Sequence, residues 1–233
     1  MPAFTHGKAA RVFMEDLNLS DYMRSVSVPA EADVAESSTF GADWKQYVVG
    51  LRDATISGEG IFDVTEDAAL IDSITVGGRS KWQVYFAGDA VGSPGRGLDC
   101  DTTGYEPSAD IGDVVMWSVE AQSSVGADRI ISHHAHAERT TSGTAAVVDN
   151  TAGSTTTGAV AYLNVTAISG SAVVVLQDSA DNITYADLIS FGTVSATGGY
   201  RGTATGQVDR YTRLVHTNAA GTITFVAGLG RAN

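Results

Sequence analysis

Apolar and polar residues alternate along most of this chain, which is the pattern of half-buried β-strands. In the first half, the predicted strands cover residues 11–14, 23–28, 54–62, 81–87, 114–121 and 128–137. In the second half they cover residues 159–168, 172–177, 186–191, 200–205, 211–217 and 222–229. Turn-forming pairs such as Ser-Gly, Asp-Asn and Gly-Gly separate the later strands, and this regular spacing predicts a β-sandwich.

Two segments depart from this pattern. Residues 64–74 (VTEDAALIDSI) predict the single helix: Thr65 can cap its start, and the acidic pair that follows suits the positive end of the helix dipole. Leu70, Ile71 and Ile74 share one side and are expected to pack the helix against the strands. Residues 88–112 are rich in Gly, Pro and Asp, and they are predicted to form a long loop.

Charge and composition both change near residue 138. Residues 1–137 contain 9 Lys/Arg and 21 Asp/Glu, whereas residues 138–233 contain 5 and 6 and are dominated by Thr, Ser, Gly, Ala and Val. We therefore predict two domains, 1–138 and 139–233. The expected fold class is mainly β: an N-terminal β-sandwich or barrel with one short helix, followed by a second β-sandwich.

The bulk composition excludes several classes of protein. A net charge of -13 leaves no basic face to attract nucleic acid phosphates. The lone Cys100 cannot form an internal disulfide and is interpreted as a stray thiol in a reducing interior. No apolar run approaches the length of a membrane helix, and the start lacks the apolar segment of a signal peptide. We expect a protein made and kept in the cytoplasm, with no membrane partner.

Candidate catalytic chemistry is sparse. His134 and His136 are two residues apart in SHHAHAER, so on a strand they would share one face and could hold a transition metal. The alternative interpretation is a polar strand edge that leads into the second domain. The chain contains no G-x-S-x-G nucleophile elbow, and GGYRGTATG lacks the Lys-Ser/Thr of a phosphate loop. We predict no enzyme activity, no catalytic residue, no cofactor and no bound metal.

Aromatic residues occupy a segment that should be a loop, within STFGADWKQYVVGLRD. Aromatic side chains supply large apolar area at low rotamer cost, and they dominate protein interfaces. We predict that this loop is buried by another copy of the chain. The alternative is a loop folded back on its own domain. The candidate contact residues are Phe40, Trp44, Tyr47, Val48 and Leu51.

The order of these motifs resembles the N-terminal half of tail tube (major tail) proteins of tailed bacteriophages. The segments that carry the resemblance are residues 19–28, 39–41, 47–53 and 58–63, and the likeness extends over about the first 140 residues. The C-terminal half is similar to the immunoglobulin-like or carbohydrate-binding sandwiches that decorate virions.

The resemblance implies a structural virion protein. Subunits of this family form rings, commonly hexameric, that stack into a hollow tail tube through which DNA passes without specific binding. It implies that the loop at residues 31–50 reaches an adjacent subunit or ring, and it implies the tape measure and tail terminator as further partners. Assembly would take place in the host cytoplasm. The C-terminal domain would face outward.

A second hypothesis is a capsid- or surface-decorating module that binds glycans, as the C-terminal half alone would suggest. The two hypotheses differ in self-assembly, because a tube protein polymerises whereas a decorating module stays small. An enzyme would instead require a metal at His134 and His136.

Overall fold

The computed structural model describes residues 5–39, 43–151 and 153–231. This part of the chain is mainly β, which confirms the predicted fold class. The strands are β1 (Arg11–Met14), β2 (Leu17–Asn18), β3 (Met23–Ser27), β4 (Ala30–Glu36), β5 (Tyr47–Ile61), β6 (Ser80–Tyr85), β7 (Pro94–Ser108), β8 (Met116–Arg139), β9 (Gly143–Thr144), β10 (Val148–Asp149), β11 (Ala159–Ser179), β12 (Ala186–Val194), β13 (Gly198–Ala204) and β14 (Tyr211–Arg231). The described residues form one α-helix, α1 (Val64–Thr75), and two 3-10 turns, η1 (Gly7–Ala9) and η2 (Leu19–Asp21). None of the helices in this described part has the length and hydropathy to cross a bilayer.

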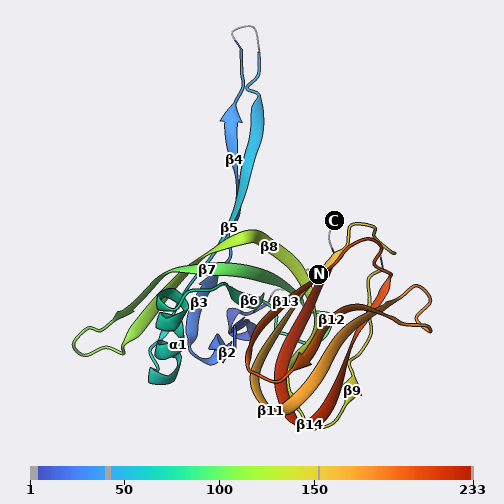
Figure 1. The fold of residues 1–233 in the computed structure, drawn as a ribbon. Helices are drawn as coiled ribbons and strands as arrows, with labels where there is room; N and C mark the ends of the chain where they lie inside the picture. Colours follow the sequence, from blue (N-terminus) through green and yellow to red (C-terminus); the bar gives the residue numbers. More distant parts are fainter. Residues whose placement is uncertain (1–4, 40–42, 152, 232–233) are drawn as a thin grey trace.

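Antiparallel pairing links the strands in the order β12-β11-β14-β8-β7-β6-β1-β2 (Figure 1). β5 pairs with β8, and β3 and β4 both pair with β5. β8 is the strand that the two halves of the chain share. Its first part pairs with β5 and β7, and its last part, from Ile131 to Arg139, pairs with β14.

The strands are longer than the sequence predicts, and the predicted loop at residues 88–112 is wrong. Most of that segment is β7, which pairs with both β6 and β8. Its glycines serve close packing rather than turns: a methyl group on Gly95 would collide with the ring of Tyr85, and one on Gly97 with the ring of Tyr162. Each pair of strands predicted at 114–121 and 128–137, 159–168 and 172–177, and 211–217 and 222–229 is likewise a single long strand.

The N-terminal half has its own apolar core, and α1 closes one side of it. Residues from β1, η2, β5, β6, β7 and β8 converge there with Leu70 of the helix. Leu70 is fully buried, whereas Ile71 and Ile74 are exposed. The helix cap is Asp63 and not Thr65, because an Asp63 carboxylate oxygen accepts from the backbone N–H of Thr65 at 2.9 Å.

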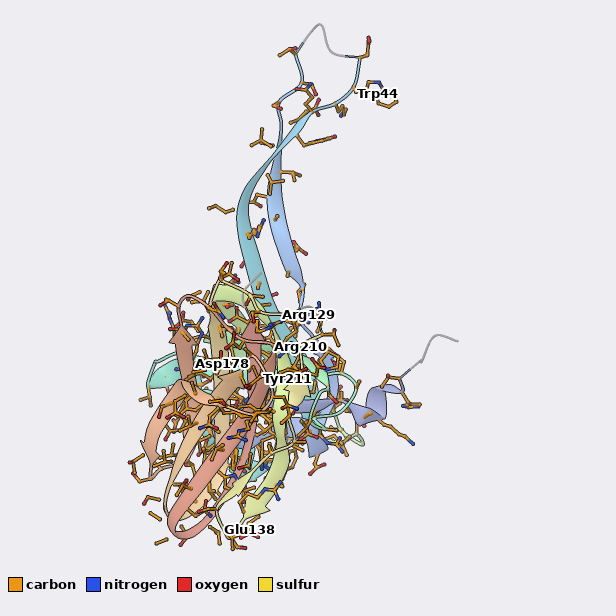
Figure 2. The ribbon with its side chains drawn as sticks, turned by 90° about the vertical axis from the view of Figure 1, so that its right-hand side faces the viewer. Trp44, Arg129, Glu138, Asp178, Arg210 and Tyr211 are labelled. Atoms are coloured by element: carbon orange, nitrogen blue, oxygen red, sulfur yellow. The ribbon has the colours of Figure 1, made fainter. Side chains whose placement is uncertain are left out.

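One part of the N-terminal half stands apart from this core. We call residues 30–53 the arm; the structure describes residues 30–39 and 43–53 of it. β4 and the first half of β5 form a two-stranded hairpin that projects away from the rest of the molecule (Figure 1), with Trp44 near its far end (Figure 2). Every described residue of the arm is exposed.

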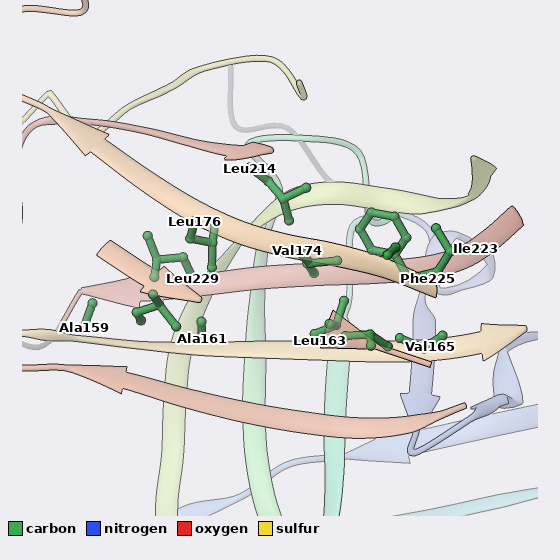
Figure 3. Close-up of a cluster of buried hydrophobic side chains, with 14 of the residues drawn as sticks. Ala159, Ala161, Leu163, Val165, Val174, Leu176, Leu214, Ile223, Phe225 and Leu229 are labelled. Atoms are coloured by element: carbon green, nitrogen blue, oxygen red, sulfur yellow. The ribbon is translucent and has the colours of Figure 1, made fainter. Parts of the chain in front are cut away.

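The C-terminal half encloses a second core between the two ends of a bent two-stranded ribbon. β11 and β14 pair along their whole lengths, with register shifts in the middle that bend both strands. Gly170 and Gly221 lie at that bend with positive φ, which favours glycine. Apolar side chains from both ends of the ribbon fill the space between (Figure 3), and they include Leu163, Leu176 and Phe225.

The two halves are fastened together by a third cluster and a buried polar network. Phe13 and Tyr85 of the first half pack with Val160, Tyr162 and Val226 of the second, around Ile130. The fully buried Asn164 donates to the backbone carbonyls of Glu15 (2.8 Å) and Lys81 (2.9 Å), and its side-chain oxygen accepts from Gln83 at 2.7 Å. The division into domains 1–138 and 139–233 stays a prediction.

Replacing Asn164 by Ala is expected to lower the free energy of unfolding by about 2–4 kcal/mol, because two carbonyls and an amide would each lose a hydrogen bond inside the protein. Urea denaturation measures this change. Thr193→Ala, on an exposed position of β12, serves as the control and should change stability by less than about 0.5 kcal/mol. A loss for Asn164→Ala no larger than for this control would contradict a structural role for the network.

Candidate assembly surface

The arm presents large apolar side chains that the rest of the described residues leave uncovered. Trp44 is 85% exposed and Leu51 is 83% exposed. Val34, Tyr47, Val48 and Val49 are also more than half exposed. Soluble proteins rarely leave apolar side chains grouped in this way, and such groups mark interaction sites.

Most of the predicted contact residues come together on the arm. Trp44, Tyr47, Val48 and Leu51 all lie there, whereas Phe40 lies outside the described residues. Tyr47, Val48 and Leu51 belong to strand β5 and not to a loop. Their role in contacts between subunits stays a prediction.

Sequence reasoning missed two members of this group, Val34 and Val49, which are directly paired across the hairpin. Paired residues in an antiparallel hairpin share a face, as Glu36 and Tyr47 do further along. The alternation in EADVAE could have identified β4 as a strand, and thus as the partner of the aromatic segment.

The arm is preformed as a hairpin and is anchored at its root. Near the tip, the Lys45 ammonium and a Glu36 carboxylate oxygen lie 3.1 Å apart, and the backbone N–H of Ser37 donates to the Gln46 carbonyl at 2.7 Å. At the root, the Asp53 carboxylate accepts hydrogen bonds from the backbone N–H of Ala54 and from the Gln122 amide on β8. Because β5 runs unbroken from the arm into the N-terminal core, the root fixes the direction of the arm.

The arm carries more acidic than basic residues. Between residues 30 and 53 the acidic side chains are Glu31, Asp33, Glu36, Asp43 and Asp53, and the basic ones are Lys45 and Arg52. A surface that covers the arm must therefore be apolar in part, and it gains from positive charge.

The two histidines considered as candidate metal ligands, His134 and His136, do not come together, because their rings face different clusters. The His134 ring stacks on Phe225 with centroids 3.9 Å apart, whereas the His136 ring lies 5.1 Å from the ring of Phe13. A register shift in the pairing of β8 with β14 falls between His134 and Ala137, and it breaks the alternation that would have put both rings on one face. Within residues 5–39, 43–151 and 153–231, no three His, Cys, Asp or Glu side chains are grouped as metal ligands would be.

The alternative interpretation of these histidines, a polar strand edge, does not fit the burial of His134, whose ring is buried against Phe225. Its Nε2 accepts from Arg139 Nε at 2.7 Å, so its Nδ1 carries the proton and lies 3.3 Å from the Phe225 carbonyl. His133 is buried too, between the Ile131 carbonyl and the Thr212 hydroxyl. Burial lowers the pKa of each ring to about 4, and for His134 the Arg139 charge adds to this.

Cys100 lies in the N-terminal core, where burial raises the pKa of its thiol to about 12. The thiolate, which is the reactive form, is therefore disfavoured at neutral pH. This agrees with the interpretation of Cys100 as a stray thiol.

No protein-family model and no curated protein matches this sequence. Among solved structures, a chain from the virion of a native gene transfer agent particle is similar, with a TM-score of 0.45 at 16% identity over 54% of this chain and 98% of that one. A chain from the tail of an empty gene transfer agent particle of C6 symmetry has a TM-score of 0.43 at 16% identity, over 52% and 95%. A chain from the SPP1 tail tube has a TM-score of 0.45 at 9% identity, over 54% and 78%.

These structural neighbours are components of virions and phage tails. Their TM-scores are all below 0.5.

The buried histidines predict that the protein loses stability on mild acidification. The folded pKa of about 4 lies below the usual 6.5, so the unfolded chain binds protons that the folded chain does not. Their contribution is complete above about pH 6.5 and is lost as the pH falls towards 4, on the order of 2 kcal/mol per histidine by about pH 5. Urea denaturation at about pH 7.5 and about pH 5 measures the difference.

The variant His133→Asn removes one of these titrations, so the difference between the unfolding free energies at the two pH values should shrink by about 2 kcal/mol. An unfolding free energy that is the same at both pH values in the unmodified protein would show that the rings are not held neutral.

Proposed function

We propose that this protein is the tail tube subunit of a tailed bacteriophage, whose copies join into rings that stack as a hollow tube for DNA passage. The observation that carries the proposal is the arm: a preformed hairpin with exposed apolar side chains, at the position in the sequence where the resemblance expects the contact with an adjacent subunit or ring. An isolated two-stranded hairpin is marginally stable in water, so burial against a second copy would stabilise the arm.

The free energies of burial and association favour a closed ring over a pair of copies joined by a single arm. Burying an apolar side chain of the size of leucine or valine contributes roughly 1.5–3 kcal/mol, whereas association costs an estimated 4–15 kcal/mol. The apolar side chains of one arm therefore offset this cost with little surplus. In a closed ring each subunit gives one arm and receives another, which places two such contacts on every copy.

The distribution of charge supports a role as a DNA conduit. The N-terminal half holds most of the net negative charge, with 21 acidic against 9 basic residues up to position 137. Walls of like charge keep a polyanion from binding as it passes. In this proposal the acidic half forms the tube, and the nearly neutral C-terminal half faces outward.

The remaining parts of the proposal follow from the family resemblance. Rings are hexameric, the tape measure and the tail terminator are the other partners, and the subunits assemble in the host cytoplasm before they become part of the virion. No catalytic step and no cofactor is required.

A glycan-binding decorating module is the second candidate. A surface pocket of about 520 Å³ supports it, because Arg129, Arg201 and Arg231 line this pocket at the junction of the two halves. In this alternative the protein would stay a small particle and bind a polar ligand there. Self-assembly separates the two candidates.

Replacing Trp44 by Ala or Leu51 by Ser is expected to reduce the polymerised fraction by about tenfold or more, because these side chains would be buried only in the assembly. The unfolding free energy of the subunit should change by less than about 0.5 kcal/mol, since both side chains are exposed in it. Sedimentation velocity measures assembly, and circular dichroism with urea measures the fold.

Ile183→Ser is the matched control, because Ile183 is 82% exposed and lies outside the arm. It should assemble normally. An equal loss of assembly in all three variants, or normal assembly of both arm variants, would exclude the arm as the contact.

A further inference from the structure

A surface pocket of about 510 Å³ lies beside the root of the arm, where strand β3 approaches strand β1 and η1. Its apolar lining comes from Val12, Met23, Val26 and the exposed ring of Phe86. The same pocket is lined by Lys8 and Arg24, and its described lining contains no acidic side chain. An apolar pocket with two cations is unusual in a chain that carries almost twice as many acidic as basic residues.

Both cations are available for a partner. Lys8 and Arg24 are exposed, and among the described residues neither has a carboxylate within ion-pair distance. The Arg24 guanidinium makes one weak contact, to the Met116 sulfur at 4.0 Å. An approaching carboxylate would therefore not have to displace an existing ion pair.

The strand edges around the pocket differ in their capacity to accept a partner. On the β1 side, the Ser20 hydroxyl accepts a hydrogen bond from the backbone N–H of Val12 at 3.0 Å and donates one to its carbonyl at 3.4 Å. These backbone groups of β1 are therefore already hydrogen-bonded. On the other side, β3 pairs with β5 alone among the described strands, so its outer edge carries no strand partner. An unpaired edge of this kind can add a further strand.

We propose that this pocket receives the arm of a second copy of the chain, with Lys8 and Arg24 facing the carboxylates of that arm. The inference rests on the proposed function and names the surface that the arm contacts. The arm matches the pocket in both respects, because it combines exposed apolar side chains with an excess of acidic residues.

The arm of the same molecule cannot fill the pocket. β4 begins at Ala30, three residues after β3 ends at Ser27, so the pocket lies at the root of its own arm. Seven extended residues carry β4 roughly 20 Å away from that root. The arm and the pocket are thus different surfaces of one molecule, and pairing one with the other makes a head-to-tail contact that either closes into a ring or propagates.

Charge reversal tests the pocket. The double variant Lys8→Glu, Arg24→Glu should reduce the polymerised fraction by about tenfold or more, because the pocket would then repel the acidic arm. Thr193→Glu is the control, since Thr193 is exposed on β12 and does not line this pocket, and it should assemble normally. Normal assembly of the double variant would overturn the inference.

Mixing the pocket variant with an arm variant should restore assembly, which would not happen if either variant were misfolded. A second variant, Asp33→Lys with Glu36→Lys, reverses charge on the arm and should also fail to assemble alone. An equal mixture of the two variants should assemble, because each reversed arm then meets a reversed pocket and each unmodified arm an unmodified pocket. Failure of the mixture, with both variants folded by circular dichroism, would overturn the inference.

Photocrosslinking separates this inference from the proposed function. With benzoylphenylalanine in place of Trp44, irradiation of the assembled protein should link the arm to peptides that contain residues 5–26 or Phe86 of a neighbouring copy. Links confined to other peptides would overturn the pocket and leave the tube proposal standing. Absence of assembly in the unmodified protein would instead contradict the tube proposal itself.

Discussion

A two-stranded ribbon has two faces and two edges, and no other described part of the chain covers those of the arm. Elsewhere in the described molecule long strands bend until their apolar faces enclose a core, as β11 and β14 do around Leu163 and Phe225. The arm has no second layer, so its apolar side chains and its backbone edges lie in water. We propose that a second copy with a matching pocket covers them.

The rest of the fold keeps the arm aimed in one direction. β5 continues from the arm into the N-terminal core, and β8 continues from that core into the C-terminal half. The Asn164 network and the cluster around Ile130 hold the two halves against each other. A contact made at the tip of the arm is therefore connected to both cores through hydrogen-bonded strands, which suits a subunit that must keep its shape in an assembly.

The sequence predicted the fold class and the helix, because strand alternation and helix periodicity are local signals. It did not predict the length of the strands. Glycine is common in turns, so Gly95 and Gly97 favoured the prediction of a loop. In the folded chain they instead make room for the aromatic rings of Tyr85 and Tyr162. The separation of His134 from His136 arises from a bulge against β14, which is again a long-range feature.

The candidate surface was predictable only in part. Exposed aromatics within a polar stretch identified Trp44 and Tyr47, since such residues are unusual in a loop. The pocket was beyond the reach of sequence patterns, because Lys8, Arg24 and Phe86 come from separate elements that only the folded sheet brings together.

Negative-stain electron microscopy of the concentrated, purified protein shows whether its copies assemble into tubes. Subunits whose arms are covered by neighbouring copies should form hollow tubes of uniform width. Small monodisperse particles, with no rings or tubes even at high concentration, would contradict the account and favour the decorating module.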